Sequence, residues 1–142
     1  MEAINIREFR FPDDYSKVIG IWEKIEKGVR VGVSDAPDEI KKKLRRDPEL
    51  FLVAEKNGDL IGTIIGGFDG RRGFIYHVAV IASCRGQGIG LRLTEEVENR
   101  LRAKGCIRCH LLVNNDNLEA RGFYENQGWK ALDDTPFAKD LI

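Results

Sequence analysis

Hydrophobic and polar positions follow two distinct periods in the first third of the chain. Residues 3–9 alternate with a period of two, which places the isoleucines on one face and predicts a strand. In residues 12–27, apolar side chains recur three and four positions apart, which predicts an amphipathic helix. Residues 37–46 predict a second, highly charged helix, which ends before Pro48 because proline disfavours helical backbone in the residue before it.

The centre of the chain predicts a hairpin and a central strand. Residues 51–68 contain two β-rich runs that flank Asn57-Gly58, a pair that accepts the positive φ angles of a tight turn. Residues 74–81 are apolar on both faces apart from His77, which is typical of a strand in the middle of a sheet.

The last third of the chain begins with a glycine-rich turn at residues 84–90. After it, leucine and valine recur four apart in residues 91–105, and Gly105 stands where a helix C-cap belongs. The remaining segments predict a strand, a short helix and a terminal pair of strands, at residues 109–115, 116–128, 129–134 and 137–142. This order predicts an α+β sandwich with a mixed sheet, parallel only where a helix crosses over.

Composition sets limits on the partners. A chain of 142 residues with 42% apolar content predicts one domain with an ordinary core. Lysine plus arginine and aspartate plus glutamate both number 23, so we expect no nucleic-acid partner. The charged N-terminus has no apolar signal region, and no apolar run approaches the roughly 20 residues of a membrane span. We therefore expect a cytoplasmic protein without a membrane partner.

Three cysteines are present, at positions 84, 106 and 109. An odd number without secretory context predicts reduced thiols rather than a disulfide framework. Cys106 and Cys109 form a C-x-x-C, but they precede a strand instead of a helix, and no second close pair completes a zinc site. We interpret them as small, partly buried side chains and expect no metal.

The turn CRGQGIG has the composition of an anion site. A glycine-rich loop at a helix N-terminus binds anions, because the first helical N–H groups are unpaired and the helix dipole favours negative charge. A mononucleotide loop would need a lysine and a hydroxyl that are missing here. A dinucleotide fingerprint would need a third glycine where Leu93 stands.

Two motifs together resemble a known family. Arg85-x-x-Gly88-x-Gly90 is similar to the signature of the GNAT superfamily of acyl-CoA-dependent N-acyltransferases. A second motif downstream, Asn117-x-x-Ala120-x-x-Phe123-Tyr124-x-x-x-Gly128-Trp129, is similar to that family's second motif. Residues 50–73 and the final two residues most resemble the small bacterial YpeA-like members of the family. The resemblance covers nearly the whole chain. It implies one GNAT domain over residues 1–142, with about four helices and a six- to seven-stranded sheet that splays between its fourth and fifth strands.

The resemblance also implies a binding site for acetyl-CoA as cosubstrate. The main chain of Val78 and Val80 would hold the pantetheine arm as an added strand. A bulge near Ala79 would direct an N–H group toward the thioester oxygen and stabilise the oxyanion of the reaction. The coenzyme pyrophosphate would be wrapped by the backbone N–H groups of the turn, which belong to Arg85, Gly86, Gln87, Gly88, Ile89 and Gly90.

Three further residues receive roles through the resemblance. Tyr124 would stand near the coenzyme sulfur and protonate the departing thiolate, or it is a packed aromatic side chain. His77 is our candidate for the base that takes the amine proton, although a histidine in a strand is more often a partly buried structural side chain. Asn117 would hold the pantetheine, cap the short helix, or do both.

The expected reaction is direct transfer of an acetyl group to a primary amine in a ternary complex, without a protein nucleophile. The acceptor is a small amine or a peptide N-terminus, as in the ribosomal-protein acetyltransferases of the superfamily. In the family, the first two helices border the acceptor groove, so the segment 28–38 and the charged run at residues 39–47 would select the acceptor, although that run is otherwise typical of a solvated helix face. A silent coenzyme A-binding regulatory module is the alternative from another class. The sequence is compatible with a monomer or a homodimer.

Two departures from the family pattern stand out. The proline that often follows the fourth-strand valine is missing after Val80, and Gly122 lies inside the short helix, where glycine costs about 1 kcal/mol relative to alanine. In addition, some members of the family use a glutamate on the fourth strand as the base, and the strand at residues 74–81 carries no acidic residue.

Overall fold

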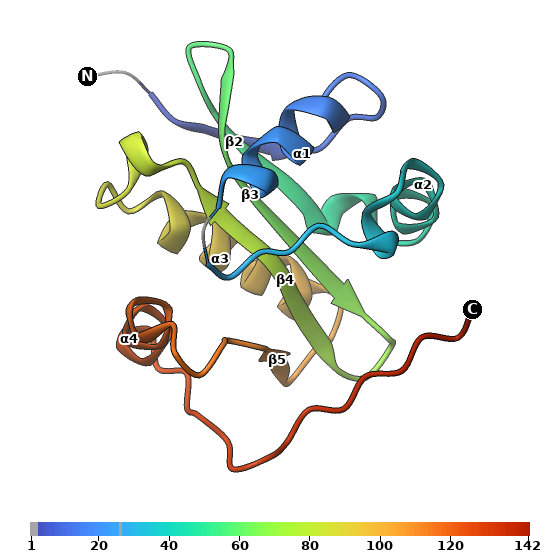
Figure 1. Cartoon of the computed structure of the whole chain (residues 1–142), viewed down its shortest axis with the longest axis vertical. Helices are drawn as coiled ribbons and strands as arrows, with labels where there is room; N and C mark the ends of the chain where they lie inside the picture. Colours follow the sequence, from blue (N-terminus) through green and yellow to red (C-terminus); the bar gives the residue numbers. More distant parts are fainter. Residues whose placement is uncertain (1–2, 26) are drawn as a thin grey trace. The chain divides into compact units, whose positions relative to one another are not determined.

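Five strands form one mixed sheet in the computed structural model, which describes residues 3–25 and 27–142. The spatial order of the strands equals their order in the sequence, and the pairs are antiparallel except for the last, which is parallel. The strands are β1 (Asn5–Glu8), β2 (Phe51–Lys56), β3 (Asp59–Phe68), β4 (Gly73–Val80) and β5 (Cys109–Leu111). The predicted mixed α+β architecture is therefore confirmed (Figure 1).

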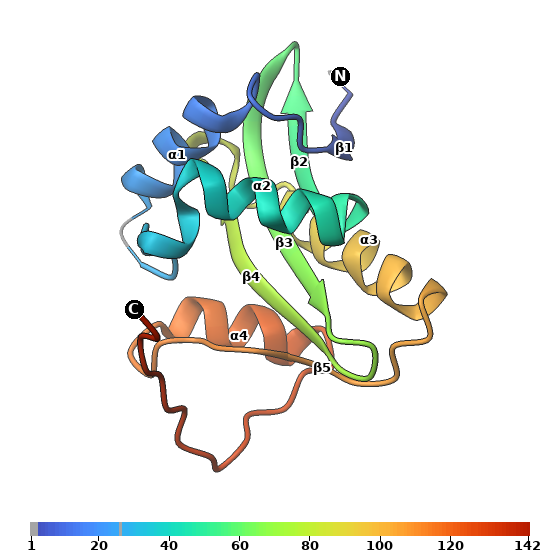
Figure 2. The ribbon, with the colours of Figure 1, turned by 90° about the vertical axis from the view of Figure 1, so that its right-hand side faces the viewer.

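Helices cover both faces of this sheet. Helices α1 (Tyr15–Lys24) and α2 (Pro37–Arg46) lie on one face and α3 (Ile89–Ala103) on the other (Figure 2). Side chains alternate accordingly: Phe51 and Val53 of β2 join the core cluster under α1 and α2. Gly66 of β3 faces α3 instead, where a Cβ atom would lie 2.8 Å from Val97 Cγ1. Glycine is thus required at that position by close packing.

Two local predictions are confirmed. The hairpin between β2 and β3 turns at Asn57 and Gly58, with φ angles of 53° and 82°. Helix α2 spans the predicted residues, with Pro37 at its start. Helix α1 is shorter than predicted, because the backbone becomes extended at Ile25.

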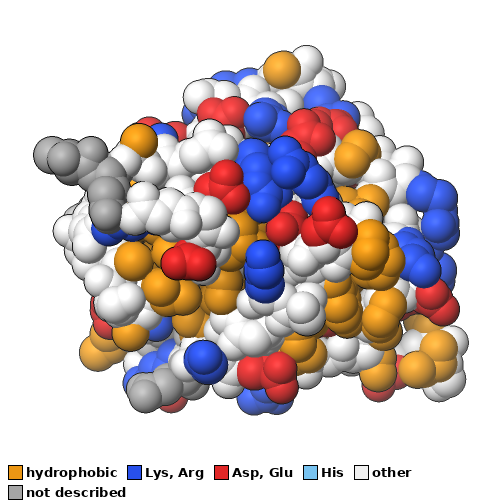
Figure 3. Space-filling view, turned by 90° about the horizontal axis from the view of Figure 1, so that it is seen from above, with side chains coloured by type: hydrophobic (Ala, Val, Ile, Leu, Met, Phe, Trp, Pro, Cys, Tyr) orange, Lys and Arg blue, Asp and Glu red, His pale blue; other side chains and the backbone are white. Residues whose placement is uncertain are grey.

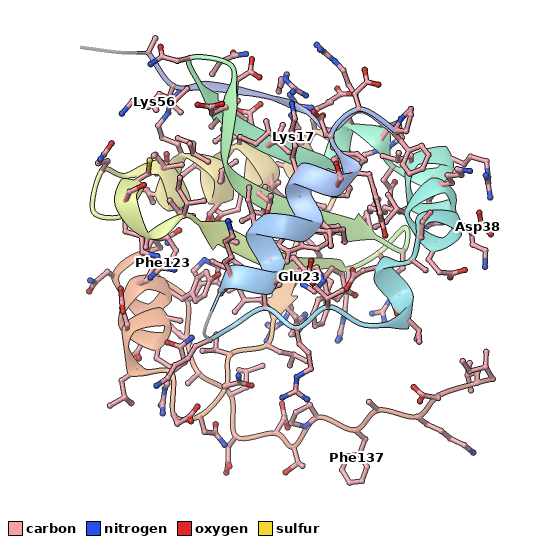
Figure 4. The ribbon with its side chains drawn as sticks, turned by 45° about the horizontal axis from the view of Figure 1, so that its top comes forward. Lys17, Glu23, Asp38, Lys56, Phe123 and Phe137 are labelled. Carbon is pink, nitrogen blue, oxygen red and sulfur yellow. The ribbon has the colours of Figure 1, made fainter. Side chains whose placement is uncertain are left out.

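The prediction of a terminal pair of strands is wrong. The described chain has five strands instead of six or seven, and residues 129–142 contain none. A strand needs a partner for its backbone groups, whereas residues 130–142 are exposed and make no hydrogen bond among the described residues. Pro136 lacks an N–H donor and Asp133-Asp134 places two like charges together, so this segment pairs poorly. Figure 4 labels Phe137 on this segment, where its side chain is 93% exposed.

Residues 1–112 and residues 113–142 form two units by their internal contacts. The sheet, α1, α2 and α3 belong to the first unit, and α4 (Leu118–Asn126) belongs to the second. The expectation of one domain over residues 1–142 stays a prediction. Among the described helices, none has the length and apolar character needed to traverse a bilayer.

A buried carboxylate ties β1 to the start of α1. Asp14 is 3% exposed and accepts two hydrogen bonds from the Arg7 guanidinium, at 2.8 and 3.0 Å, and one from the Arg10 N–H at 2.8 Å. Burial alone would raise the pKa of Asp14, but these hydrogen bonds outweigh it and hold the pKa below its usual range. On the face of the molecule seen in Figure 3, by contrast, acidic and basic side chains lie next to one another.

Candidate functional site

The glycine-rich turn joins β4 to α3 through two left-handed residues. A short 3-10 helix at Ala82–Cys84 follows the end of β4. After it, Gly86 and Gly88 adopt φ angles of 77° and 78°. A Cβ atom at either glycine would meet no atom within 4 Å, so their side-chain positions face open space. The backbone conformation, rather than crowding within the protein, requires glycine at both positions.

The N-terminus of α3 offers unpaired donors beside this open space. Gly88 is the N-cap residue and provides no side-chain cap. Among the described residues, no acceptor takes a hydrogen bond from the backbone N–H groups of residues 88–91. The first turn carries no acidic residue, so the positive end of the helix dipole is not neutralised there. This arrangement can bind an anion through backbone donors.

The Arg85 side chain connects the turn to the end of β4. Its Nε donates a hydrogen bond to the Val80 carbonyl at 3.0 Å. Arg85 and Gln87 are both exposed, whereas Ile89 is buried and anchors the first turn of α3. The predicted turn residues therefore divide into an exposed loop and a buried anchor.

The edge of β4 becomes free along its second half. β5 pairs with β4 only at Gly73–Ile75, and no other described strand pairs with that edge. On the opposite edge, the Ile81 N–H bonds to the Ile61 carbonyl at 2.9 Å. Because backbone groups alternate between the two edges, the N–H and C=O of Val80 point toward the free edge. The predicted splay between the fourth and fifth strands is confirmed.

A β-bulge lies where this free edge begins. Val80 pairs with Gly62 and Ala79 with Thr63, but the register shifts before Tyr76 pairs with Ile65. His77 and Val78 thus form the bulge, immediately before the expected position near Ala79, whose side chain is buried in the core. His77 has a φ of 50°, an uncommon backbone conformation for a residue other than glycine.

The His77 side chain is held by residues of α1 and of the segment after it. Its Nε2 lies 3.0 and 3.2 Å from the two carboxylate oxygens of Asp35, in the 3-10 helix Val33–Asp35. Its ring packs against the Trp22 ring, edge to face, with 4.5 Å between centroids. Sequence reasoning missed Asp35 and Trp22 as partners. Asp35 lies inside the segment 28–38 that was expected to select the acceptor.

In the second unit, Asn117 and Tyr124 belong to α4. Asn117 is its N-cap, and its side-chain oxygen accepts a hydrogen bond from the Ala120 N–H at 3.2 Å. The Tyr124 ring packs against Phe123 and Trp129, with centroid distances of 5.0 and 5.9 Å. Burial raises the pKa of Tyr124 to about 12, so its hydroxyl stays protonated at neutral pH.

The three cysteines are free thiols. Cys84 and Cys106 are buried, and burial raises the pKa of Cys109 to about 12. A thiol with a raised pKa is a poor nucleophile, which supports the interpretation of Cys109 as structural. The described residues contain no cluster of histidine, cysteine and carboxylate side chains that could hold a metal ion.

Fold and candidate site together define a class of protein: an α+β fold with unpaired backbone N–H groups at an open helix N-terminus, next to the free edge of a splayed sheet. Residues 17–129 match the model of the acetyltransferase (GNAT) family, and the chain belongs to that family. The predicted superfamily is thereby confirmed, whereas the YpeA-like subgroup stays a prediction.

Individual relatives agree with this assignment. An acetyltransferase of Pectobacterium atrosepticum is 40% identical over 139 residues, which are 98% of this chain and 96% of that protein. Ard1 from Thermoplasma volcanium is 29% identical with a TM-score of 0.77, over 89% of this chain and 82% of that chain. PaiA N-acetyltransferase from Thermoplasma acidophilum, solved in complex with coenzyme A, has a TM-score of 0.81 over 94% and 93% of the two chains. At 21% identity, this structural likeness shows a shared fold and no more.

Proposed function

We propose that this protein is an acetyl-CoA-dependent N-acetyltransferase that transfers the acetyl group directly to a primary amine in a ternary complex. The observation that carries the proposal is the open N-terminus of α3, with its unpaired N–H groups, at the end of the free edge of β4. Membership of the acetyltransferase family and the coenzyme A complex of the PaiA enzyme support it.

The two parts of this site match the two parts of the cosubstrate. The backbone of residues 85–90 binds the pyrophosphate, because a left-handed loop and a helix N-terminus present N–H donors to an anion. The main chain at Val78–Val80 binds the pantetheine arm, since an extended amide chain can pair with an unpartnered strand edge. Asn117 holds the pantetheine in addition to capping α4.

Residues of the chain then take up and donate the protons of the reaction. His77 takes one proton from the ammonium group of the acceptor, so that the amine nitrogen can attack the thioester carbon. A backbone N–H at the bulge stabilises the resulting oxyanion. When the carbon–sulfur bond breaks, the second amine proton is lost to water, and Tyr124 gives its proton to the departing sulfur and regains one from water.

The raised pKa of Tyr124 limits how it can act. Its proton transfer to a thiolate in water would be uphill by about 5 kcal/mol, given a reference thiol pKa of about 8.5. Burial also raises the pKa of a thiol, so the difference is smaller for a sulfur held in the same environment. Tyr124 therefore acts first as a hydrogen-bond donor to the sulfur. Its proton moves to the sulfur only as the negative charge of the thiolate develops.

The acceptor is a small-molecule amine or a peptide N-terminus, and the segment 28–38 selects between them. The test is a thiol-release assay with acetyl-CoA and a panel of amines and peptides that includes both classes, together with calorimetric titration of coenzyme A. We expect release with at least one class. Coenzyme A binding without release for any acceptor would instead support a regulatory module, and absence of binding would refute the proposal.

A further inference from the structure

Asp35 holds His77 in one orientation. Asp35 is 6% exposed, and its carboxylate accepts a hydrogen bond from the Gly32 N–H at 3.0 Å through Oδ2. Its backbone carbonyl accepts a second one from the Tyr15 hydroxyl at 2.7 Å. The carboxylate is therefore fixed by its own segment, and Oδ1 lies 3.0 Å from His77 Nε2.

This contact determines which nitrogen of the imidazole carries the hydrogen. A carboxylate only accepts hydrogen bonds, so a neutral His77 bonds to Asp35 through an Nε2–H group. Nδ1 then keeps its lone pair and can accept a proton. In the protonated ring both nitrogens carry hydrogen, and the Nε2–H group still donates to Asp35. The Tyr15 hydroxyl lies at this contact as well, because it donates to the Asp35 carbonyl.

Hydrogen bonds also hold the backbone of His77. Its φ of 50° is unfavourable for a residue with a Cβ atom, and such conformations persist when surrounding contacts enforce them. The His77 carbonyl accepts a hydrogen bond from the Thr63 hydroxyl at 2.9 Å, and Thr63 in turn accepts one from Trp22 Nε1 at 2.8 Å. Thr63 and Trp22 are buried. Three elements thus fix one strained residue.

We infer that Asp35 is a positioning residue for acetyl transfer: it holds His77 in the Nε2–H form, with Nδ1 available to take the proton of the acceptor ammonium group. This inference rests on the proposed function. The proton moves from the acceptor nitrogen to Nδ1 and afterwards to water, while Asp35 stays ionised. The acceptor segment 28–38 therefore supplies the residue that orients the base as well as the surface that meets the acceptor.

The first arm of the test requires no activity. The chain has two histidines, so the nitrogen-15 signals of His77 can be assigned against His110 and the tautomer read directly. We expect the Nε2–H form in the wild type and loss of that preference in Asp35→Asn, whose amide can donate to Nε2. Asp47→Asn is the matched control, since Asp47 is also 6% exposed but pairs with Lys43. A wild-type Nδ1–H tautomer, or the same tautomer in Asp35→Asn, would overturn the inference.

The second arm separates a base from a structural histidine. Ethylamine is an ammonium ion at pH 7.5, whereas 2,2,2-trifluoroethylamine is neutral because fluorine withdraws electron density, so only the former needs the first deprotonation. His77→Asn is the suitable variant, since asparagine tolerates left-handed backbone. We expect it to lower kcat/KM for ethylamine by about 100-fold or more, and for the fluorinated amine by less than about 10-fold. Asp35→Asn should also lower kcat/KM more for ethylamine than for the fluorinated amine, but by a smaller factor than His77→Asn.

Equal losses for the two amines in folded His77→Asn would show a structural role and overturn the inference. If the wild type transfers acetyl to neither amine nor to any member of the panel, the proposed function fails, and the tautomer measurement still decides whether Asp35 orients His77. Thermal unfolding of each variant establishes that the comparison is made on folded protein.

Discussion

A methyl group at Gly88 should weaken coenzyme A binding far more than it weakens the fold. Gly88 has a φ of 78°, and its Cβ position meets no atom within 4 Å. Alanine in left-handed backbone costs about 1–2 kcal/mol, partly offset because alanine also restricts the unfolded chain. We expect a net loss of about 1 kcal/mol. For 142 residues the unfolding entropy is about 0.3 kcal/mol/K, so the melting temperature should fall by about 3 °C.

The effect on the ligand follows from where the methyl group points. It enters open space at the N-cap of α3, within the turn where the pyrophosphate is proposed to bind. Loss of one hydrogen bond to a charged group costs about 1.5–3 kcal/mol, which corresponds to a roughly 10- to 100-fold rise in the Kd of coenzyme A. Titration calorimetry on Gly88→Ala measures this directly.

Gly58→Ala is the matched control, because Gly58 has a φ of 82° and equally open surroundings but lies in the β2–β3 turn. It should lose the same stability and keep the wild-type Kd. A second control is S-acetylpantetheine, which lacks the pyrophosphate, so its kcat/KM should be similar in Gly88→Ala and wild type. Equal Kd values for both glycine variants, or equal losses for both acetyl donors, would refute the assignment of the turn to the pyrophosphate.

Further predictions concern single side chains. Tyr124→Phe should lower kcat by about 100-fold or more with an unchanged Kd for coenzyme A, whereas Tyr76→Phe, at a half-exposed ring, should change neither; undiminished turnover in Tyr124→Phe would exclude the donor role. Asp14→Asn should destabilise the protein by about 1–3 kcal/mol at pH 7. Because the folded pKa of Asp14 is depressed, that deficit should shrink as the pH falls from about 4 through the folded pKa, which urea titrations at several pH values would measure. Gly66→Ala should destabilise by about 1–3 kcal/mol through its clash with α3, whereas Gly20→Ala, in open space within α1, should stabilise by up to about 1 kcal/mol in the same assay.

Features specified by local chemistry could be predicted from the sequence. The hairpin follows from Asn57-Gly58, whose residues tolerate the positive φ angles of the turn. The bounds of α2 follow from Pro37 at its first turn and Pro48 beyond its end. The glycine-rich turn likewise lies where the sequence predicts it, between a strand and the N-terminus of a helix.

Features that depend on distant partners could not be predicted in this way. The terminal segment contains short apolar runs that predict strands, but a strand forms only where another strand meets it, and residues 129–142 have no such partner among the described residues. The contact between Asp35 and His77 joins positions 42 residues apart, and neither residue belongs to a motif that predicts the contact. Only the three-dimensional structure brings the acceptor segment and the bulge together.

The bulge explains why one short stretch of β4 can serve as a site. At His77 and Val78 the strand leaves its register with β3, and directly before this point, at Ile75, its pairing with β5 ends. Two residues further on, the Val80 carbonyl at the free edge accepts the Arg85 hydrogen bond, which fixes the glycine turn to the strand. The proposed pantetheine edge and the proposed pyrophosphate site are thereby joined by a short, hydrogen-bonded connection rather than by a mobile loop. Their separation is set by the fold before any ligand arrives, so binding need not spend free energy on ordering this connection.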